Sequence, residues 1–160
     1  MQIEGKYEFD APPERVYAAL LDPAILASCM PGCEKLEASG ADTFDVVLSV
    51  GVAAVKGRYA GSVILKDKNP PHSYSMEIKG SGPPGFVSGH AHFSITPQNG
   101  RSEIRVTSDV EVGGMIARVG QRVLGGVSKF MIGQFFDCLK KKCGGEEDID
   151  PLSLDEPTRG

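Results

Sequence analysis

The chain of 160 residues contains no tryptophan, and aromatic residues make up only 7% of it. Aromatic surfaces on which bases or sugars could stack are therefore scarce. No stretch approaches the roughly 20 consecutive apolar residues that a membrane-spanning helix needs. The N-terminus also lacks the basic and apolar regions of a secretory signal peptide. We therefore expect a cytoplasmic protein, in which cysteine thiols are kept reduced.

A strong positive charge is also lacking. The net charge is −4, but residues 144–160 hold six acidic residues and one arginine, so the other 143 residues sum to about +1. Nucleic-acid binding relies on neutralising several phosphates, and a near-neutral body without a basic stripe argues against it. We expect residues 1–143 to form one domain and the acidic tail, residues 144–160, to be disordered.

Motifs of nucleophilic or phosphate chemistry are equally scarce. The sequence has no Gly-x-Ser-x-Gly turn of the kind that carries a catalytic serine. The glycine-rich stretch at residues 79–86 lacks the Gly-Lys-Ser/Thr ending of a phosphate-binding loop and precedes a strand pattern, so we interpret it as a hairpin connection. Phe86 at its end is expected at the mouth of a pocket. We predict no catalytic residue and no resident cofactor.

Histidines and carboxylates do not form a recognisable metal or acid–base set. His90 and His92 share one strand face, opposite the apolar face, and no third metal ligand can be identified. We expect this pair to be exposed, and whether it binds a metal is left open. Glu77, Asp109 and Glu111 alternate with apolar residues and are expected to point to water.

The four cysteines do not predict a disulfide framework. Cys29 and Cys33 are four residues apart, but Pro31-Gly32 lies between them and prevents a common helix face. We interpret this stretch as a turn that ends a helix and leads into the sheet, in preference to a redox or zinc site. Cys138 and Cys143 are five apart on a helical pattern, and we expect a buried Cys138 and a frayed Cys143.

The periodicity of apolar residues predicts an α+β protein. Residues 2–9 alternate as a half-buried strand does, and Asp10 is expected to cap the helix that follows. A second short helix is predicted at residues 24–30. Between residues 33 and 112, short alternating runs with brief connections indicate an antiparallel meander. Apolar residues at three- and four-residue spacing from Ile116 to Leu139 then predict one long C-terminal helix.

This long helix can bury its apolar stripe only against the concave face of a curved sheet. Its expected glycines, Gly120, Gly125, Gly126 and Gly133, are small residues that would leave space between helix and sheet. These glycines are a first indication of an internal cavity between the helix and the sheet. Its candidate lining residues are Leu26, Met30, Phe44, Tyr59, Phe86, Phe93, Met115, Val119, Val123 and Val127.

Several strings in the chain resemble the G-subunit family of carbon monoxide dehydrogenase. They are I-E-G-x-Y-x-F-x-A-P-P-E-x-V-Y-x-A-L-L-D-P from residue 3, M-P-G-C-E at 30–34, V-G-V-x-x-V-K-G-x-Y at 50–59, G-x-G-P-P-G-F-V-x-G at 80–89, V-x-V-G-G-x-I-A-x-V-G at 110–120, and Q-F-F at 134–136. Together they cover most of residues 1–143. The resemblance implies the START-like, or helix-grip, fold, in which a curved antiparallel sheet wraps around a long C-terminal helix and encloses an apolar cavity.

The resemblance also implies a function. Proteins of this family are similar to accessory proteins of molybdenum-containing carbon monoxide dehydrogenases and related hydroxylases, and assist enzyme maturation or recruitment to the membrane. The resemblance implies a bound lipophile, such as a fatty acid or a quinone, and the subunits of the enzyme as partners. Peripheral contact with the inner face of the membrane is also implied, although the acidic tail argues against anchoring through that segment.

Two other functions stay open on the sequence alone. The same cavity could hold the active site of a START-like cyclase or hydrolase, which would require at least two ionisable groups pointing inward. Alternatively, the chain could be an interaction subunit with a completely filled core. The sequence does not identify the ligand, the partner enzyme or the oligomeric state.

Overall fold

The structure of the chain, a computed structural model, describes residues 1–52 and 55–143. The predicted acidic tail, residues 144–160, lies outside the described residues. The elements in chain order are β1 (Gln2–Phe9), α1 (Pro13–Leu20), α2 (Pro23–Cys29), β2 (Cys33–Gly40), β3 (Thr43–Val50), β4 (Gly57–Asn69), β5 (Ser73–Gly82), β6 (Gly85–Gln98), β7 (Arg101–Gly113), η2 (Met115–Val119) and α3 (Gln121–Cys143).

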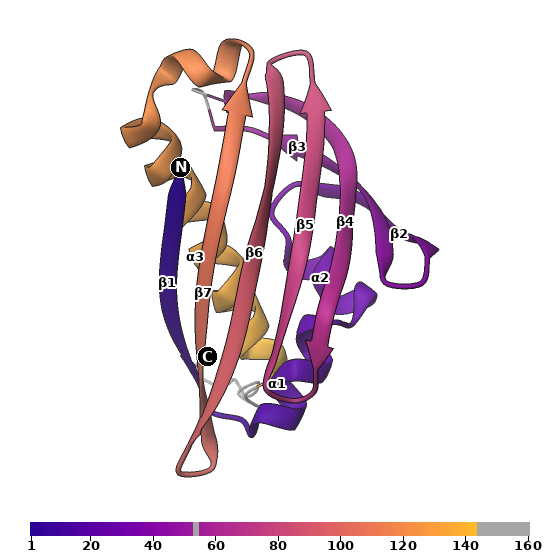
Figure 1. Cartoon of the computed structure of the whole chain (residues 1–160), viewed down its shortest axis with the longest axis vertical. Helices are drawn as coiled ribbons and strands as arrows, with labels where there is room; N and C mark the ends of the chain where they lie inside the picture. Colours follow the sequence, from indigo (N-terminus) through magenta and orange to yellow (C-terminus); the bar gives the residue numbers. More distant parts are fainter. Residues whose placement is uncertain (53–54, 144–160) are drawn as a thin grey trace, which may run out of the picture.

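All seven strands form one antiparallel sheet in the order β1-β7-β6-β5-β4-β3-β2. Consecutive strands from β2 to β7 are neighbours, and β1 pairs with β7, for example Ile3 opposite Ser108. Figure 1 shows α3 crossing one face of the sheet, with α1 and α2 at the lower end. The predicted α+β helix-grip architecture is confirmed. The sequence pattern does not single out β2, because this edge strand has mostly exposed side chains.

The two short helices begin at prolines, because a proline at the first helical position has no amide hydrogen that would need a partner. Asp22 caps α2, and its Oδ1 accepts a hydrogen bond from the Ala24 amide at 2.9 Å. The expectation that Asp10 caps α1 is wrong. Pro12 occupies the N-cap position without a side-chain hydrogen bond, and Asp10 forms an ion pair with Arg101 at 2.5 Å instead.

The long C-terminal helix begins later than the apolar spacing indicates. Gly114 and Gly120 have φ values of 81° and 90°, a left-handed conformation that favours glycine. These glycines bound a separate short 3-10 helix, η2, and α3 starts at Gln121. Gly120 therefore lies outside the long helix, contrary to prediction. Residues of η2 consequently face other directions than a continuous helix would give them.

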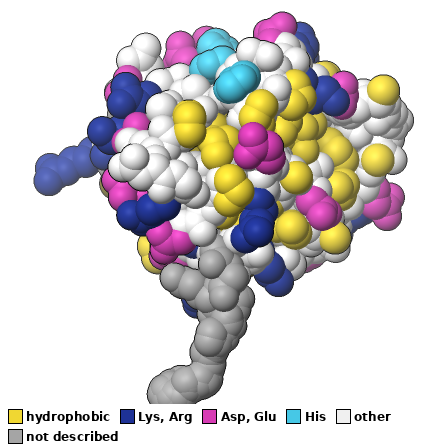
Figure 2. Space-filling model, turned by 90° about the horizontal axis from the view of Figure 1, so that it is seen from below, with side chains coloured by type: hydrophobic (Ala, Val, Ile, Leu, Met, Phe, Trp, Pro, Cys, Tyr) yellow, Lys and Arg dark blue, Asp and Glu magenta, His cyan; other side chains and the backbone are white. Residues whose placement is uncertain are grey.

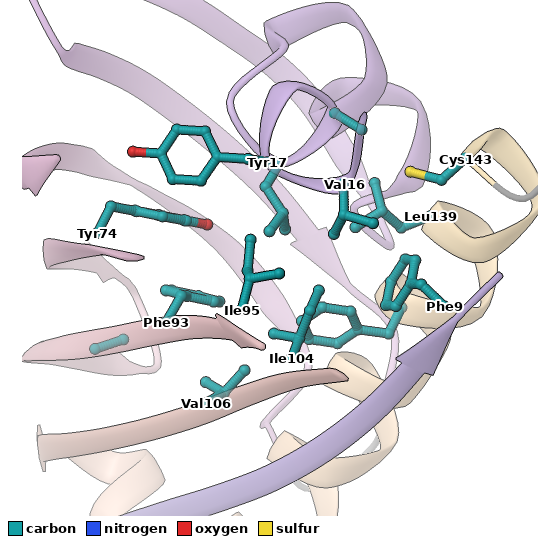
Figure 3. Close-up of a cluster of buried hydrophobic side chains, with 14 of the residues drawn as sticks. Phe9, Val16, Tyr17, Tyr74, Phe93, Ile95, Ile104, Val106, Leu139 and Cys143 are labelled. Carbon is teal, nitrogen blue, oxygen red and sulfur yellow. The ribbon is translucent and has the colours of Figure 1, made fainter. Parts of the chain in front are cut away.

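The main core lies between the lower part of the sheet, α1 and the C-terminal half of α3. Figure 3 shows Phe9, Val16, Ile104 and Leu139 pointing toward one another from β1, α1, β7 and α3. Phe136 packs edge-on against Phe9, with ring centroids 6.1 Å apart. This dense packing closes the lower end of the space between sheet and helix.

Candidate ligand cavity

A cavity of about 450 Å³ lies between the concave face of the sheet and the helices. Its lining comprises Ile3, Leu36, Phe44, Val46, Leu48, Val63, Leu65, Tyr74, Met76, Ile78, Val87, Ala91, Phe93, Val106, Ser108, Val110 and Val112 from the strands, and Leu20, Leu26, Ile116, Leu124, Val127, Ser128, Met131, Ile132, Phe135 and Phe136 from the helices. Met1, Met30, Pro31 and Val55 complete it. Every strand contributes because alternate residues point inward, and α3 forms the opposite wall.

The lining is almost entirely apolar. Among the described residues, no aspartate, glutamate, histidine, lysine, arginine or cysteine side chain lines the cavity. The Ser108 hydroxyl already donates a hydrogen bond to the Ile3 carbonyl at 3.2 Å. The Met1 amino group donates to the Val110 carbonyl at 2.8 Å. The wall therefore offers an extended apolar surface and few hydrogen-bonding groups to a ligand.

Tyr74 is the ionisable side chain of this lining. It is buried, and its ring stacks on Phe93 with centroids 4.7 Å apart. Burial raises the pKa of the Tyr74 hydroxyl far above its usual value, because the phenolate would lose its hydration. Tyr74 therefore stays neutral at physiological pH and adds no charge to the cavity.

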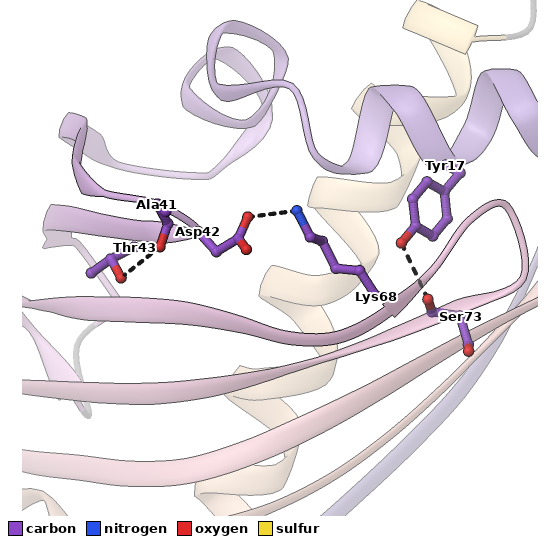
Figure 4. A network of polar contacts seen from close by, with 6 residues as sticks. All are labelled: Tyr17, Ala41, Asp42, Thr43, Lys68 and Ser73. Atoms are coloured by element: carbon purple, nitrogen blue, oxygen red, sulfur yellow. Dashed lines mark hydrogen bonds and ion pairs between the residues drawn. The ribbon is translucent and has the colours of Figure 1, made fainter.

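The lower end of the cavity is held shut by α1 and the β4–β5 hairpin. The Tyr17 hydroxyl donates to the Ser73 carbonyl at 3.2 Å (Figure 4). The Tyr17 ring packs edge-on against Tyr74. Nearby, Lys68 pairs with Asp42 at 2.6 Å, which links β4 to the β2–β3 turn (Figure 4). These contacts join the elements around the closed end.

Five of the ten predicted lining residues line the cavity: Leu26, Met30, Phe44, Phe93 and Val127. The other five lie elsewhere. Tyr59 belongs to a small cluster around Val55, and its hydroxyl donates to the Val55 carbonyl at 2.6 Å. Phe86, Met115 and Val123 are exposed, and Val119 packs at the edge of the same small cluster. Whether any of these residues binds a ligand stays a prediction.

The local structure around these residues explains why they lie outside the cavity lining. Met115 and Val119 are carried by η2, which the positive φ of Gly120 turns away from the axis of α3. Val123 is exposed on α3, whereas Val127, four residues later and therefore rotated by about 40° around the helix axis, lines the cavity. Phe86 lies over Gly113, where a side chain on that glycine would collide with its ring.

Sequence reasoning missed several lining residues, although a signal for some of them was available. Val46 and Leu48 share the apolar face of β3 with Phe44, so the same alternation that selects Phe44 also selects them. On α3, Met131 and Phe135 follow Val127 at helical spacing. The strand and helix periodicities thus identify the walls, but not where the walls end.

A second pocket of about 400 Å³ adjoins the cavity at the end near η2. It shares four lining residues with the cavity, namely Met1, Val110, Val112 and Leu124. Its other lining residues are Phe86, Glu111, Ala117 and Gln121, so this pocket is more polar than the cavity. Phe86 thus lines the second pocket, and its position at the mouth of the ligand cavity stays a prediction.

The cysteines differ most from expectation. Cys29 and Cys138 form a disulfide that joins α2 to α3, with Cα atoms 5.3 Å apart. Cys143 is not frayed but buried, and burial raises the pKa of its thiol. Cys33 is half-buried and reduced. Sequence alone could not pair Cys29 with Cys138, because 109 residues separate them and no local pattern records that the two helices touch.

Histidines and carboxylates lie where the strand pattern places them. His90, His92, Asp109 and Glu111 are exposed on the outer face of the sheet. Within residues 1–52 and 55–143, no group of three potential metal-ligating His, Cys, Asp or Glu side chains occurs. Glu77 pairs with Lys66, which lowers the pKa of the Glu77 carboxyl by hydrogen bonding and charge attraction. These groups lie outside the cavity.

The curved sheet, the C-terminal helix and the cavity between them define a START-like protein. A START superfamily protein from Mycobacterium smegmatis shares this fold at a TM-score of 0.67 with 11% identity, over 89% of this chain and 96% of that one. A protein from Chromobacterium violaceum is similar at a TM-score of 0.69 with 17% identity, over 89% and 96% of the two chains. Both likenesses concern the fold alone.

The family is established by sequence. The profile of the carbon monoxide dehydrogenase G-subunit family (CoxG) matches residues 5–144, and the chain belongs to this family. A conserved protein from Geobacillus kaustophilus is 38% identical, with a TM-score of 0.87 over 89% of this chain and 95% of that one. No curated protein matches the sequence. Among the described residues, no helix is both long and apolar enough to cross a membrane.

Proposed function

We propose that this protein is a non-enzymatic accessory protein that holds a lipophilic molecule beside a molybdenum-containing carbon monoxide dehydrogenase or a related hydroxylase. The observation that carries this proposal is the cavity of about 450 Å³ with its almost entirely apolar wall. Membership of the CoxG family supports the association with the enzyme. Delivery of a hydrophobe, enzyme maturation or recruitment to the membrane are the roles that such a protein could serve.

The cavity suits a long, flexible apolar ligand. Its volume falls within the range of about 300 to 1,000 Å³ that is typical of small-molecule sites. Each ligand CH₂ group removed from water contributes about 0.8 kcal/mol, so affinity can come from buried area with few hydrogen bonds. Met30, Met76 and Met131 in the wall are unbranched and adaptable, which suits ligands of variable shape. A fatty acid or a quinone with an apolar tail meets these requirements.

The competing enzymatic function has weaker support. A cyclase or hydrolase would place at least two ionisable groups in the cavity to move protons. The described lining holds one ionisable side chain, Tyr74, whose raised pKa keeps it protonated. The alternative of an interaction subunit with a filled core conflicts with the volume of the cavity.

Native mass spectrometry of the purified protein tests the binding function. We expect an added mass that corresponds to a co-purified lipophile, or the formation of a complex after a fatty acid or a quinone is offered. A protein that is ligand-free and binds neither compound would count strongly against the proposal. The association with the enzyme is tested separately by measuring binding of the purified protein to the purified dehydrogenase.

A matched pair of variants connects binding to the cavity. Val127→Phe adds volume inside the cavity, whereas Val123→Phe places the same change four residues earlier at an exposed position of α3. We expect Val127→Phe to weaken binding of the lipophile by at least about tenfold, because the ring occupies ligand space, and Val123→Phe to bind normally. Equal binding by both variants would place the ligand outside this cavity.

A further inference from the structure

α2 forms part of the cavity wall, although little of the helix is buried. Leu26 lines the cavity, as do Met30 and Pro31 directly after the helix. Of the seven residues of α2, all of them described, Cys29 alone is buried. Figure 2 looks at the end of the molecule that carries α1 and α2, and hydrophobic side chains reach the surface there among charged ones. The helix is therefore a thin cover over the apolar interior.

The chain is anchored on both sides of α2. Before the helix, the Asp22 amide donates a hydrogen bond to the Ala19 carbonyl of α1 at 3.3 Å. After it, the Ser49 amide of β3 donates to the Gly32 carbonyl at 2.8 Å. Gly32 has a φ of 74°, and a Cβ atom at this position would collide with the Ser49 carbonyl oxygen. Residues 23–31 thus lie between two fixed points, and we call them the α2 segment.

The disulfide is the strong connection between the α2 segment and α3. Cys29 at the end of α2 is bonded to Cys138 of α3. The ion pairs found among residues 1–52 and 55–143 include none between these two helices. The Cys138 Sγ lies 4.0 Å from the Ser28 carbonyl oxygen, but a disulfide sulfur carries no hydrogen that it could donate. Without the disulfide, apolar packing would hold the α2 segment to α3.

We propose that the disulfide between Cys29 and Cys138 is a redox-controlled closure of the cavity. In the oxidised protein the bond holds the α2 segment against α3, and Leu26 and Phe135 line the wall on the two sides. In the reduced protein the segment moves away from α3 between its two fixed points, and a lipophile enters or leaves there. Control of ligand exchange rests on the proposed lipophile-binding function, whereas movement of the segment on reduction does not.

The reaction partner is a dithiol reductant. Cys138 is half-buried and Cys29 is 4% exposed, so a thiolate of the reductant reaches the Cys138 sulfur first. A mixed disulfide with Cys138 forms, and Cys29 leaves as a thiolate that takes up a proton. The second thiol of the reductant then loses its proton, attacks its own sulfur of the mixed disulfide and releases the Cys138 thiol. Two electrons and two protons pass to the protein, and the reductant becomes a disulfide.

Hydrogen exchange of the full chain tests the movement without any ligand. The Leu26 and Met30 amides donate to the Asp22 and Leu26 carbonyls, both at 2.9 Å, and report on the α2 segment. We expect dithiothreitol to accelerate exchange of these two amides by roughly tenfold or more, because the segment opens locally. Unchanged exchange would overturn the proposal. A reduced protein that unfolds as a whole, as judged by circular dichroism, would make the disulfide a structural crosslink and would also overturn it.

Release of a fluorescent fatty acid, cis-parinaric acid, tests the consequence for the cavity. Stopped-flow fluorescence after addition of excess oleic acid measures its dissociation rate from the full chain. We expect reduction of the parent protein to raise this rate by roughly tenfold or more, because an open segment shortens the residence time of the ligand. Cys138→Ser should release the probe at the high rate with or without dithiothreitol. Equal rates from the oxidised and the reduced parent would overturn the proposed control of exchange.

Two variants serve as matched controls. Cys33→Ser removes a free thiol and keeps the disulfide, so it should respond to dithiothreitol as the parent does. Ser102→Ala removes the hydroxyl that donates to the Ala11 carbonyl, which lowers stability without changing the α2 segment. In its oxidised form it should keep the slow α2 exchange and the slow release of the parent. A Cys33→Ser protein that ignores dithiothreitol, or an oxidised Ser102→Ala protein as fast as the reduced parent, would overturn the proposal.

The two measurements separate this proposal from the binding function. Faster exchange of the Leu26 and Met30 amides on reduction, in a protein that binds neither a fatty acid nor a quinone, supports the movement and contradicts only the proposed function. A bound lipophile whose release does not respond to reduction contradicts only the redox-controlled closure.

Discussion

Ser102 is a polar side chain with no exposed surface, and it fixes the corner between β1 and α1. Its hydroxyl donates a hydrogen bond to the Ala11 carbonyl at 2.6 Å. The Ala11 carbonyl lies just before α1, so this contact holds the start of the helix against β7. A buried carbonyl without a hydrogen-bond partner has lost its bonds to water and gained none in return, which costs free energy. This hydrogen bond is therefore important for stability.

Ser102→Ala is therefore expected to lower the free energy of unfolding by about 1–2 kcal/mol, because the Ala11 carbonyl would remain buried without a donor. Urea denaturation followed by circular dichroism measures this change. Ser49→Ala, at an exposed position on β3, is the control and should change stability by less than about 0.5 kcal/mol. Equal stability of the two variants would contradict the role assigned to Ser102.

Cys143 and Cys33 should differ in reactivity, although both are free thiols. Cys143 is 2% exposed, and burial raises the pKa of its thiol despite the opposing charge of Arg15. A raised pKa leaves less thiolate at any given pH, and the thiolate is the reactive form. Iodoacetamide should therefore modify the half-buried Cys33 of the native protein first, and Cys143 only after unfolding. Peptide mass spectrometry after timed labelling measures both rates, and comparable rates would show that Cys143 is accessible.

Among the helices, the disulfide between Cys29 and Cys138 joins two residues that are 109 positions apart in the sequence. It joins α2, which contributes Leu26 to the cavity wall, to α3, which contributes Phe135. The two helices are thus covalently connected on one side of the cavity. A crosslink of this kind stabilises a protein mainly by restricting the unfolded chain, and more so for long loops.

Removing this disulfide by Cys138→Ser, or by reduction, should lower the free energy of unfolding by about 2–4 kcal/mol. Guanidinium denaturation with and without dithiothreitol measures the difference. Cys33→Ser is the control, because Cys33 forms no disulfide in the described structure, and its stability should respond to dithiothreitol as that of the unchanged protein does. An unchanged midpoint of the parent protein under reduction would show that the bond contributes little.

Within the sheet, β4 and β5 approach each other closely at two glycines that lie directly opposite, Gly61 and Gly80. A Cβ atom on Gly61 would collide with the backbone carbonyl oxygen of Lys79. A Cβ atom on Gly80 would meet the Ala60 carbonyl oxygen at 3.9 Å, an ordinary contact. The two positions therefore tolerate a side chain differently, although they are neighbours.

Gly61→Ala should destabilise the protein by several kcal/mol or prevent folding, because β4 and β5 would have to separate, whereas Gly80→Ala should remain within about 1 kcal/mol of the parent. Thermal denaturation, or soluble yield where a variant does not fold, measures the contrast. Two equally stable variants would show that the strands can shift at little cost.

For the molecule as a whole, ligand binding and stability are coupled, because an occupied cavity stabilises only the folded state. A fatty acid or quinone at about 100 times its Kd should add about 2.7 kcal/mol of stability. For a domain of this size, that corresponds to a rise in Tm of roughly 5–10 °C. Differential scanning calorimetry should show this rise for the parent and for Val123→Phe, but not for Val127→Phe. A similar rise in both variants would locate the ligand outside the cavity.

The order of elements and the faces of the strands could be predicted because they are recorded locally. Alternation places Phe44 and Phe93 inside and His90 and Glu111 outside, since successive side chains of a strand point to opposite faces. The spacing of Val127 and its neighbours likewise predicts the apolar side of α3. The sequence strings that resemble the CoxG family connect these elements to the helix-grip fold. None of this information depends on contacts between distant residues.

What the sequence by itself determined is thus the helix-grip layout, the apolar walls and the outward position of the charged strand residues. The tertiary structure decided where the cavity ends, which residues of η2 and α3 turn outward, and that Cys29 meets Cys138. These features depend on φ at Gly114 and Gly120 and on the packing of α2 against α3. The packing of α2 against α3 arises from proximity in space. Hydrophobic periodicity along the chain encodes neither this packing nor the backbone turn at the two glycines.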